Sequence, residues 1–304
     1  MGNLGYACIN MQLRKQNIFA GRTCRKAKFD EKGLEYVGEL GLQNLRDLFQ
    51  IIQWNERNGI KFYRIGSDIF PWSSEYEYSD LPQYDKVKIL CKAIGDYATK
   101  VGQRLTFHPG PFNILGSSSE DVVRRTMIDL RHHSELFDLM GFEPSVYNKI
   151  NIHVGAAYKD KYAVLRRWCD NYNKLDENTK KRITIENDDK ANLYTTADLY
   201  DHIYSVVGVP IVFDYHHHSC NSGDLSHQDA LELAISTWPK GITPIVHYSS
   251  ARQIEDPKAK LQAHADYIHI DYINTYGHDV DVMLECKAKE LALLEYRKKQ
   301  SILV

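Results

Sequence analysis

The sequence predicts a parallel (β/α)₈ barrel, a TIM barrel, that occupies residues 1–304 as a single domain. Short apolar runs of strand length alternate with longer helical patterns along the whole chain. No linker, internal repeat or low-complexity tract divides these units, and barrels of this length commonly form one domain. Several of the apolar runs also end in histidine, aspartate or glutamate, which is typical of barrel strands whose ends build a site.

Eight strands are expected from the apolar runs. Most are rich in Ile, Val, Leu and Phe and are too short for helices, as in buried parallel strands. They cover residues 4–10, 62–65, 104–108, 150–153, 183–186, 211–214, 244–247 and 280–285.

Helices are expected between the strands. Apolar residues at three- and four-residue spacing, such as Leu42, Leu45 and Leu48, predict the first of them, and Gly141 marks the end of another. The expected helices cover 35–59, 84–101, 120–140, 161–172, 195–206, 226–237 and a segment around 256–265. Two long loops, 66–78 and 109–119, should lie on the face where the strands end.

Six strand ends carry residues that bind metals. They are His108, His153, Glu186, Asp214, His247 and Glu285. In a parallel barrel all strand C-termini meet on one face, so these side chains should converge. Burying several carboxylates together is costly unless cations neutralise them, and a set of His, Asp and Glu without thiolates suits divalent metals. The sequence therefore predicts a cluster of metal ions.

Other polar residues have more than one interpretation. At most two of His216, His217 and His218 can easily join one site. Arg64 could bind a phosphate or pair with the carboxylates. The His132-His133 pair is expected on the surface of its helix, and His202, His227, His269 and His278 are expected to be bystanders.

Composition excludes some classes of protein. No apolar run is long enough to span a membrane, and no signal peptide is recognisable, so we expect no membrane partner. The six cysteines are scattered without a C-x-x-C pair, which favours a reducing intracellular compartment; Cys220 and Cys286 are expected to be buried hydrophobes. A net charge of −2 gives no electrostatic argument for nucleic acid, which would require a locally basic rim.

Seven motifs follow one another along nearly the whole chain. They are RIGSDIFPW from Arg64, HPG from His108, IHVG from Ile152, ENDD from Glu186, DYHHH from Asp214, VHYSS from Val246 and AHADYIH from Ala263. In this combination and order they resemble the UV-damage endonucleases, which are related to endonuclease IV.

This resemblance implies a three-metal site that nicks damaged double-stranded DNA immediately 5′ of a UV photoproduct, and of an abasic site as a further substrate, leaving a 3′-hydroxyl and a 5′-phosphate. The implied ligands of the first ion are His108, His153 and Glu186. Glu186 would bridge to a second ion held by Asp214, His247 and Glu285, and His217 and His264 would hold the third. Glu186, Asp214, His247 and Glu285 would form the catalytic centre. The family favours manganese, with zinc or magnesium as alternatives, and the protein is expected to act as a monomer.

The resemblance also implies contacts to DNA, for which we expect Tyr6, Asn10, Arg64, Pro111 and Phe112. The chain departs from the family pattern at three places. Ile245 stands where a lysine that can reach the metals is usual, Pro111-Phe112 replaces a glutamine and an aromatic, and His216 replaces an apolar residue.

Two rival functions use the same kind of barrel. A sugar isomerase or epimerase would need a closed pocket, which the long loops argue against. A protein that binds damaged DNA without cutting it would not need the bridging Glu186.

Overall fold

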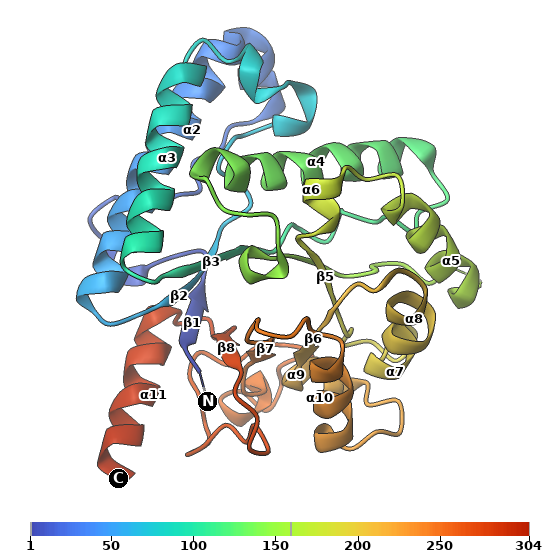
Figure 1. Cartoon of the computed structure of the whole chain (residues 1–304). Helices are drawn as coiled ribbons and strands as arrows, with labels where there is room; N and C mark the ends of the chain where they lie inside the picture. The colour runs from blue at the N-terminus through green and yellow to red at the C-terminus, as the bar shows by residue number, and fades with distance from the viewer. Residues whose placement is uncertain (1, 159, 304) are drawn as a thin grey trace.

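The strands form a closed parallel barrel, as predicted. The computed structural model describes residues 2–158 and 160–303, and its eight strands pair in chain order from β1 to β8 (Figure 1). The barrel closes where Leu4, Gly5 and Tyr6 of β1 pair with Val282, Met283 and Leu284 of β8. The strands are β1 (Leu4–Ala7), β2 (Phe62–Ile65), β3 (Arg104–Phe107), β4 (Ile150–Ile152), β5 (Ile183–Glu186), β6 (Ile211–Asp214), β7 (Ile245–Tyr248) and β8 (Asp281–Leu284).

Helices alternate with the strands and cover the outside of the barrel (Figure 1). The longer helices are α2 (Lys26–Arg57), α3 (Tyr84–Lys100), α4 (Glu120–Met140), α5 (Lys161–Tyr172), α10 (His227–Ser236) and α11 (Glu290–Leu303). The shorter ones are α1 (Met11–Arg14), α6 (Glu177–Lys180), α7 (Thr196–Leu199), α8 (Ser205–Val207) and α9 (Tyr215–Cys220). Local sequence sets their ends: Ser119 caps α4, and Gly141, at a φ of 80°, terminates it.

The helix predictions were wrong in several places, and the short helices α1, α6 and α9 were not predicted. The helix expected over 35–59 is α2, which begins at Lys26, nine residues earlier than expected. A kink at Gly33 (φ 65°) joins its two parts. No helix forms over 256–265; that segment is held by an isolated bridge between Ala251 and His264. The helix α11 was not predicted. It packs against β1, beside the closure of the barrel.

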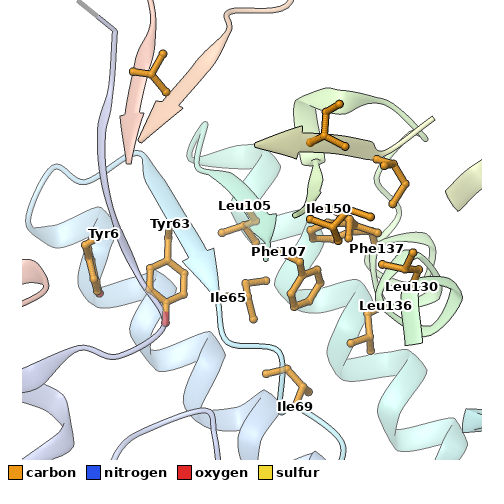
Figure 2. Close-up of a cluster of buried hydrophobic side chains, with 14 of the residues drawn as sticks. Tyr6, Tyr63, Ile65, Ile69, Leu105, Phe107, Leu130, Leu136, Phe137 and Ile150 are labelled. Atoms are coloured by element: carbon orange, nitrogen blue, oxygen red, sulfur yellow. The ribbon is translucent and has the colours of Figure 1, made fainter. Parts of the chain in front are cut away.

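The core lies mainly between the barrel and its helices. Outward side chains of β2, β3 and β4, including Ile65, Phe107 and Ile150, face Leu130 and Phe137 of α4 (Figure 2). The barrel interior holds a second apolar cluster that includes Ala7, Phe62, Val212, Ile245 and Met283. Below it, at the N-terminal ends of the strands, the buried Arg104 pairs with Asp281 at 2.8 Å. The polar strand ends therefore stand at the mouth above an apolar filling.

Two further expectations concern cysteines and membranes. All six cysteines are free; Cys286 is buried as expected, whereas Cys220 is only partly buried. Among the residues described, no helix combines the length and apolar character needed to cross a membrane.

Candidate metal centre

The six strand-end residues lie together at the mouth of the barrel. Glu186 and Asp214 are the last residues of β5 and β6, and His247 lies within β7. His108 and His153 directly follow β3 and β4, and Glu285 directly follows β8. Because each strand ends at the same face, residues that are far apart in the chain come within a few ångströms of one another.

Glu186 is at the centre of this arrangement. Its Oε2 lies 3.1 Å from both His108 Nε2 and His247 Nδ1, and its Oε1 lies 3.3 Å from His217 Nδ1. The side chain is fully buried, and Oε1 has no hydrogen-bond donor among the described residues. One carboxylate thus faces imidazoles from several strands.

Three overlapping groups at the mouth could each hold a metal ion. They are His108–His153–Glu186, Glu186–Asp214–His217 and Asp214–His247–Glu285, and within each group the ligand atoms lie within 4.8 Å of one another. Glu186 and Asp214 each belong to two groups. Asp214 Oδ2 and His247 Nδ1, like Glu186 Oε1, are buried without a hydrogen-bond partner in the described chain. Carboxylate oxygens and imidazole nitrogens that are buried without a hydrogen-bond partner are suitable ligand atoms for divalent cations.

The protonation equilibria of the centre also indicate a need for cations. Burial, together with the charges of Glu186 and Glu285, raises the pKa of Asp214 to about 7, although His217 opposes the shift. Burial lowers the pKa of His153 and His217, but neighbouring carboxylates outweigh it and raise the two pKa values to about 9 and about 10. Metal ions bind the deprotonated forms of these groups, so binding of cations would compete with these protons.

Arg64 is paired with a carboxylate. Its Nη1 contacts Glu285 Oε1, and both side chains are only 13% exposed. Of the two interpretations left open by the sequence, the structure favours the structural partner over the phosphate ligand. Arg64 therefore compensates the charge of the partly buried Glu285.

The triplet His216–His218 lies within the short helix α9, which Asp214 caps by accepting a hydrogen bond from His217 N. The helix directs the three rings differently. His217 faces Glu186, whereas His218 Nε2 shares a hydrogen bond with Leu225 O. His216 packs beside His264, with ring centroids 5.2 Å apart, and its Nε2 has no partner in the part of the chain described.

His264 lies at the edge of the centre. Its Nδ1 shares a 2.7 Å hydrogen bond with Ser249 Oγ, and its ring centroid is 6.1 Å from that of His217. It belongs to none of the three groups. The family resemblance alone supports it as a ligand.

The structure corrects the expectation that Tyr6 and Asn10 contact DNA. Both side chains are fully buried. The Tyr6 hydroxyl donates to Asn55 Oδ1 and accepts from Asn10 Nδ2, while Asn10 Oδ1 caps α1 by accepting from Leu13 N. Their polar atoms are used within the fold because Tyr6 points into the core between the barrel and α2 (Figure 2).

Phe112, by contrast, is 85% exposed on the loop between β3 and α4, directly after Pro111. It lines a cavity of about 870 Å³ that also includes His108, Trp72, Arg14 and Arg125. The cavity therefore connects exposed aromatic and basic side chains with the edge of the candidate metal centre.

Three residues that support the centre were missed from the sequence. Asn151 Nδ2 donates to Glu186 Oε2 at 2.5 Å, and Asp188 Oδ1 lies 3.0 Å from His153 Nδ1. Lys149 is fully buried, with its Nζ 3.5 Å from His247 Nε2, and burial holds the pKa of Lys149 well below its ordinary value. Two-residue alternation from His153 back to Asn151 and Lys149 was the signal for two of them.

A further group, Glu77–His132–Glu135, lies away from the mouth, on α4 and on the loop between β2 and α3. Both Glu77 oxygens accept hydrogen bonds from Arg131 at 2.7 Å, so this group is already an ion-pair network. His132 and His133 are buried, which corrects their expected surface position; His132 packs on Tyr78.

Of the histidines expected to lie outside any site, His269 pairs with Glu255 and His278 approaches Glu232.

Comparison with known proteins agrees with the fold and shows the family of the chain. The sequence profile of the family described as UV-endonuclease UvdE matches residues 2–302. The chain belongs to the UvdE family. It is 35% identical over 302 residues to a putative UV-damage endonuclease of Acanthamoeba polyphaga mimivirus, covering 96% of this chain and 89% of the relative.

Other UvdE relatives agree. The chain is 34% identical over 316 residues to the UV-damage endonuclease of Schizosaccharomyces pombe; 99% of this chain is covered but only 51% of that protein, so the chain spans about half its length. Among solved structures, SacUVDE superposes with a TM-score of 0.86 at 32% identity, covering 100% of this chain and 99% of SacUVDE. Membership in the family supports an endonuclease as the enzyme class.

More distant structures show the fold alone. Endonuclease IV from Thermus thermophilus has a TM-score of 0.59 at 11% identity, covering 98% of this chain and 99% of that one. A D-psicose 3-epimerase from Clostridium cellulolyticum has a TM-score of 0.53 at 15% identity, covering 79% of each chain.

Proposed function

We propose that this UvdE protein hydrolyses a phosphodiester bond in damaged double-stranded DNA, immediately 5′ of a UV photoproduct and, as a further substrate, of an abasic site. The observation that carries the proposal is Glu186, a buried carboxylate shared by two candidate groups with one oxygen unpaired. A carboxylate in that position suits a centre of adjacent divalent ions. The products would be a 3′-hydroxyl and a 5′-phosphate.

The proposed centre takes three divalent ions. His108, His153 and Glu186 would hold the first, and Asp214, His247 and Glu285 would hold the second together with Glu186. His217, with His264 at the edge, would hold the third. Such ions, when bound, lower the pKa of water and neutralise charge on a phosphate and its leaving oxygen. Manganese is the expected metal, with zinc and magnesium as alternatives.

The protein's own residues have two tasks in this proposal. Arg64 and the histidines around Glu186 lower the pKa of Glu186 and Glu285 against the effect of burial, so these two acids keep their charged forms. Burial of Asp214 and His247 keeps bulk water away from the inner side of the centre, which strengthens electrostatic interactions there. The catalytic residues are thus Glu186, Asp214, His247 and Glu285.

The DNA would approach over the cavity beside His108. Arg14 and Arg125 line it and can contact phosphates, while Phe112 and Trp72 offer ring faces on which displaced bases can stack. The lining also contains Asp68 and Asp129, so DNA binding here would depend on the individual contacts of Arg14 and Arg125 and not on a net positive charge. We further propose that residues 1–304 act as one domain and as a monomer.

A nicking assay tests the proposal. A duplex labelled at one end and carrying a single photoproduct is incubated with metal-depleted protein, with and without added manganese. We expect one manganese-dependent nick directly 5′ of the lesion and none in the matched undamaged duplex. Binding without any nick at every metal tested, or turnover of ketoses in a parallel panel with intact DNA, would exclude the proposed reaction.

A further inference from the structure

Two polar side chains that the proposed chemistry does not use lie one layer below the candidate ligands. Asn151 of β4 and Thr184 of β5 are fully buried, and each stands two residues before a candidate ligand, His153 or Glu186. Successive residues of a strand point to opposite faces, so both side chains point into the barrel, whereas Ile150 faces the helices (Figure 2). Burying an amide and a hydroxyl costs stability unless both are hydrogen-bonded, so their partners indicate what they do.

The two side chains form a hydrogen-bonded chain that ends on Glu186. Thr184 Oγ1 donates to Asn151 Oδ1 at 2.8 Å, and Asn151 Nδ2 donates to Glu186 Oε2 at 2.5 Å. The strands set this contact in register, because Asn151 pairs with Thr184 across β4 and β5. An ionised carboxylate only accepts hydrogen bonds, so the amide must turn its Nδ2 to Glu186 and its Oδ1 to the Thr184 hydroxyl. Both hydrogen bonds therefore run in one direction, towards the carboxylate.

The chain of hydrogen bonds acts on one of the two oxygens of Glu186. Oε2 accepts from Asn151 and lies 3.1 Å from His108 Nε2. Oε1 lies 3.3 Å from His217 Nδ1 and has no hydrogen-bond donor among the described residues. The terminal torsion of a glutamate has broad preferences of its own, so a hydrogen bond to one oxygen from a fixed amide sets the plane of the carboxylate. In that plane the two oxygens face two different candidate groups, those that contain His108 and His217.

We propose that Asn151 is a positioning residue that holds the carboxylate of Glu186 in the orientation in which it bridges two metal ions, and that Thr184 holds the amide of Asn151. This inference rests on the proposed metal centre. Neither side chain titrates and neither belongs to a candidate ligand group, so both act only through Glu186. Hydrogen-bond partners of this kind orient the ligands of metal sites, and their loss typically lowers metal affinity by about 10–100-fold.

Substitutions of Thr184 separate the hydroxyl from the shape of the side chain. In Thr184→Val the shape is kept, but Asn151 Oδ1 loses its donor and the amide can turn away from Glu186. Because Glu186 would bridge two ions, the affinity for both should fall by about 10–100-fold. Thr184→Ser, which keeps the hydroxyl, should bind both ions as tightly as the wild type. Asn151→Ala removes the whole contact and should show the same loss, and it decides the question if the valine variant does not fold.

Thr106 provides the matched control. It lies on β3 and is as fully buried as Thr184, but its Oγ1 has no hydrogen-bond partner in residues 2–158 and 160–303. Thr106→Val therefore makes the same chemical change in the same barrel without breaking a hydrogen bond. The affinity for every ion should be unchanged in this variant.

Manganese is the probe, and the measurement uses the full chain without DNA. Each metal-depleted variant is first shown to be folded by circular dichroism. Manganese is then titrated in, and the free ion is measured by EPR, which gives the number of bound ions and their affinities. Because only folded protein is titrated, a variant that is merely less stable would still bind manganese with the wild-type affinities.

The expected result is weaker binding of two ions in Thr184→Val and Asn151→Ala, with wild-type binding in Thr184→Ser and Thr106→Val. Wild-type affinities in both Thr184→Val and Asn151→Ala, or an equal loss in Thr106→Val, would overturn the role of Asn151 and Thr184 while leaving the metal centre intact. A Thr184→Ser variant that binds as weakly as Thr184→Val would overturn the role of the hydroxyl. If Glu186→Gln binds manganese as tightly as the wild type, the proposed centre itself is wrong.

Discussion

Replacing Glu186 with glutamine should abolish cleavage while leaving the barrel folded. The substitution keeps the size of the side chain and one acceptor oxygen, which can still receive the hydrogen bond from Asn151. It removes a charge that faces His108 and His247 at 3.1 Å and His217 at 3.3 Å. The change therefore acts on electrostatics far more than on packing.

The magnitude follows from the position of Glu186 in two candidate groups. Loss of a partner that only supports a metal ligand typically costs 10–100-fold, and Glu186 is itself a candidate ligand at two sites. We expect kcat/KM to fall by at least about 10³-fold, equivalent to about 4 kcal/mol of transition-state stabilisation. The free energy of unfolding of the metal-free protein should change by less than about 2 kcal/mol, the scale of individual hydrogen bonds.

The assay is single-turnover nicking of a photoproduct duplex at saturating manganese, with bound metal measured by elemental analysis. Glu135→Gln is the matched control, since it neutralises a partly buried glutamate in the group with Glu77 and His132, away from the mouth. The control should retain activity within about twofold. If Glu186→Gln keeps more than a tenth of the wild-type rate with its metal content unchanged, the bridging role of Glu186 is wrong.

Three further predictions concern pH, lesion recognition and metal loss. The pKa values of His153 and His217 are raised to about 9 and about 10 in the folded chain, so the stability that these two histidines contribute is present below the ordinary histidine pKa and is lost as the pH rises through the raised values. In chemical denaturation of metal-depleted protein, the free energy of unfolding should therefore fall above pH 7, by up to about 1.4 kcal/mol per pH unit for each proton. A free energy of unfolding that does not change with pH would contradict this prediction. Phe112→Ala should lower kcat/KM about tenfold at a photoproduct, through lost stacking of about 1–3 kcal/mol per base, and less at an abasic site, where one base is already missing. Ile89→Ala, which removes another exposed apolar side chain (72%) on α3, should change neither rate. Equal losses on both duplexes would mean that Phe112 does not stack on displaced bases. Because Ile245 offers no ligand, the third ion should leave before the other two during mild chelation, and simultaneous loss of all metal in elemental analysis would count against this.

Most of the fold and the inner part of the candidate centre could be predicted from the sequence. Buried parallel strands are continuous apolar runs, so the polar residue at each end is conspicuous, as with Phe213 followed by Asp214. The geometry of a closed barrel then brings those ends together without any further information. The grouping of Glu186 with residues of β3, β6 and β7 follows from topology alone.

Other features depend on tertiary contacts that no local pattern contains. Tyr6 has the type of side chain that stacks on bases, but Asn55 of α2 and Asn10 take its hydroxyl, and the ring is buried. His132 falls in a polar stretch of its helix, yet Tyr78 and Glu77 from a preceding loop cover it. Residues of this kind are placed by segments far away in the chain.

Lys149 shows the same limitation at the centre itself. Before Asn151 and His153 it has the correct alternation for the inner face, but a lysine at the start of a strand is ordinarily a solvent-exposed residue. Only the crossing of the barrel to His247 reveals its position. The amine that contacts His247 belongs to Lys149, the residue before β4, whereas position 245 of β7 is an apolar isoleucine.

The most direct test of the account is the anomalous scattering of manganese in crystals grown with the metal. We predict three peaks at the mouth of the barrel, two of them sharing Glu186 as a ligand, with His108 and His153 at one and Asp214, His247 and Glu285 at the other. Peaks confined to the protein surface, or the absence of any peak beside Glu186 at saturating manganese, would contradict the proposed centre.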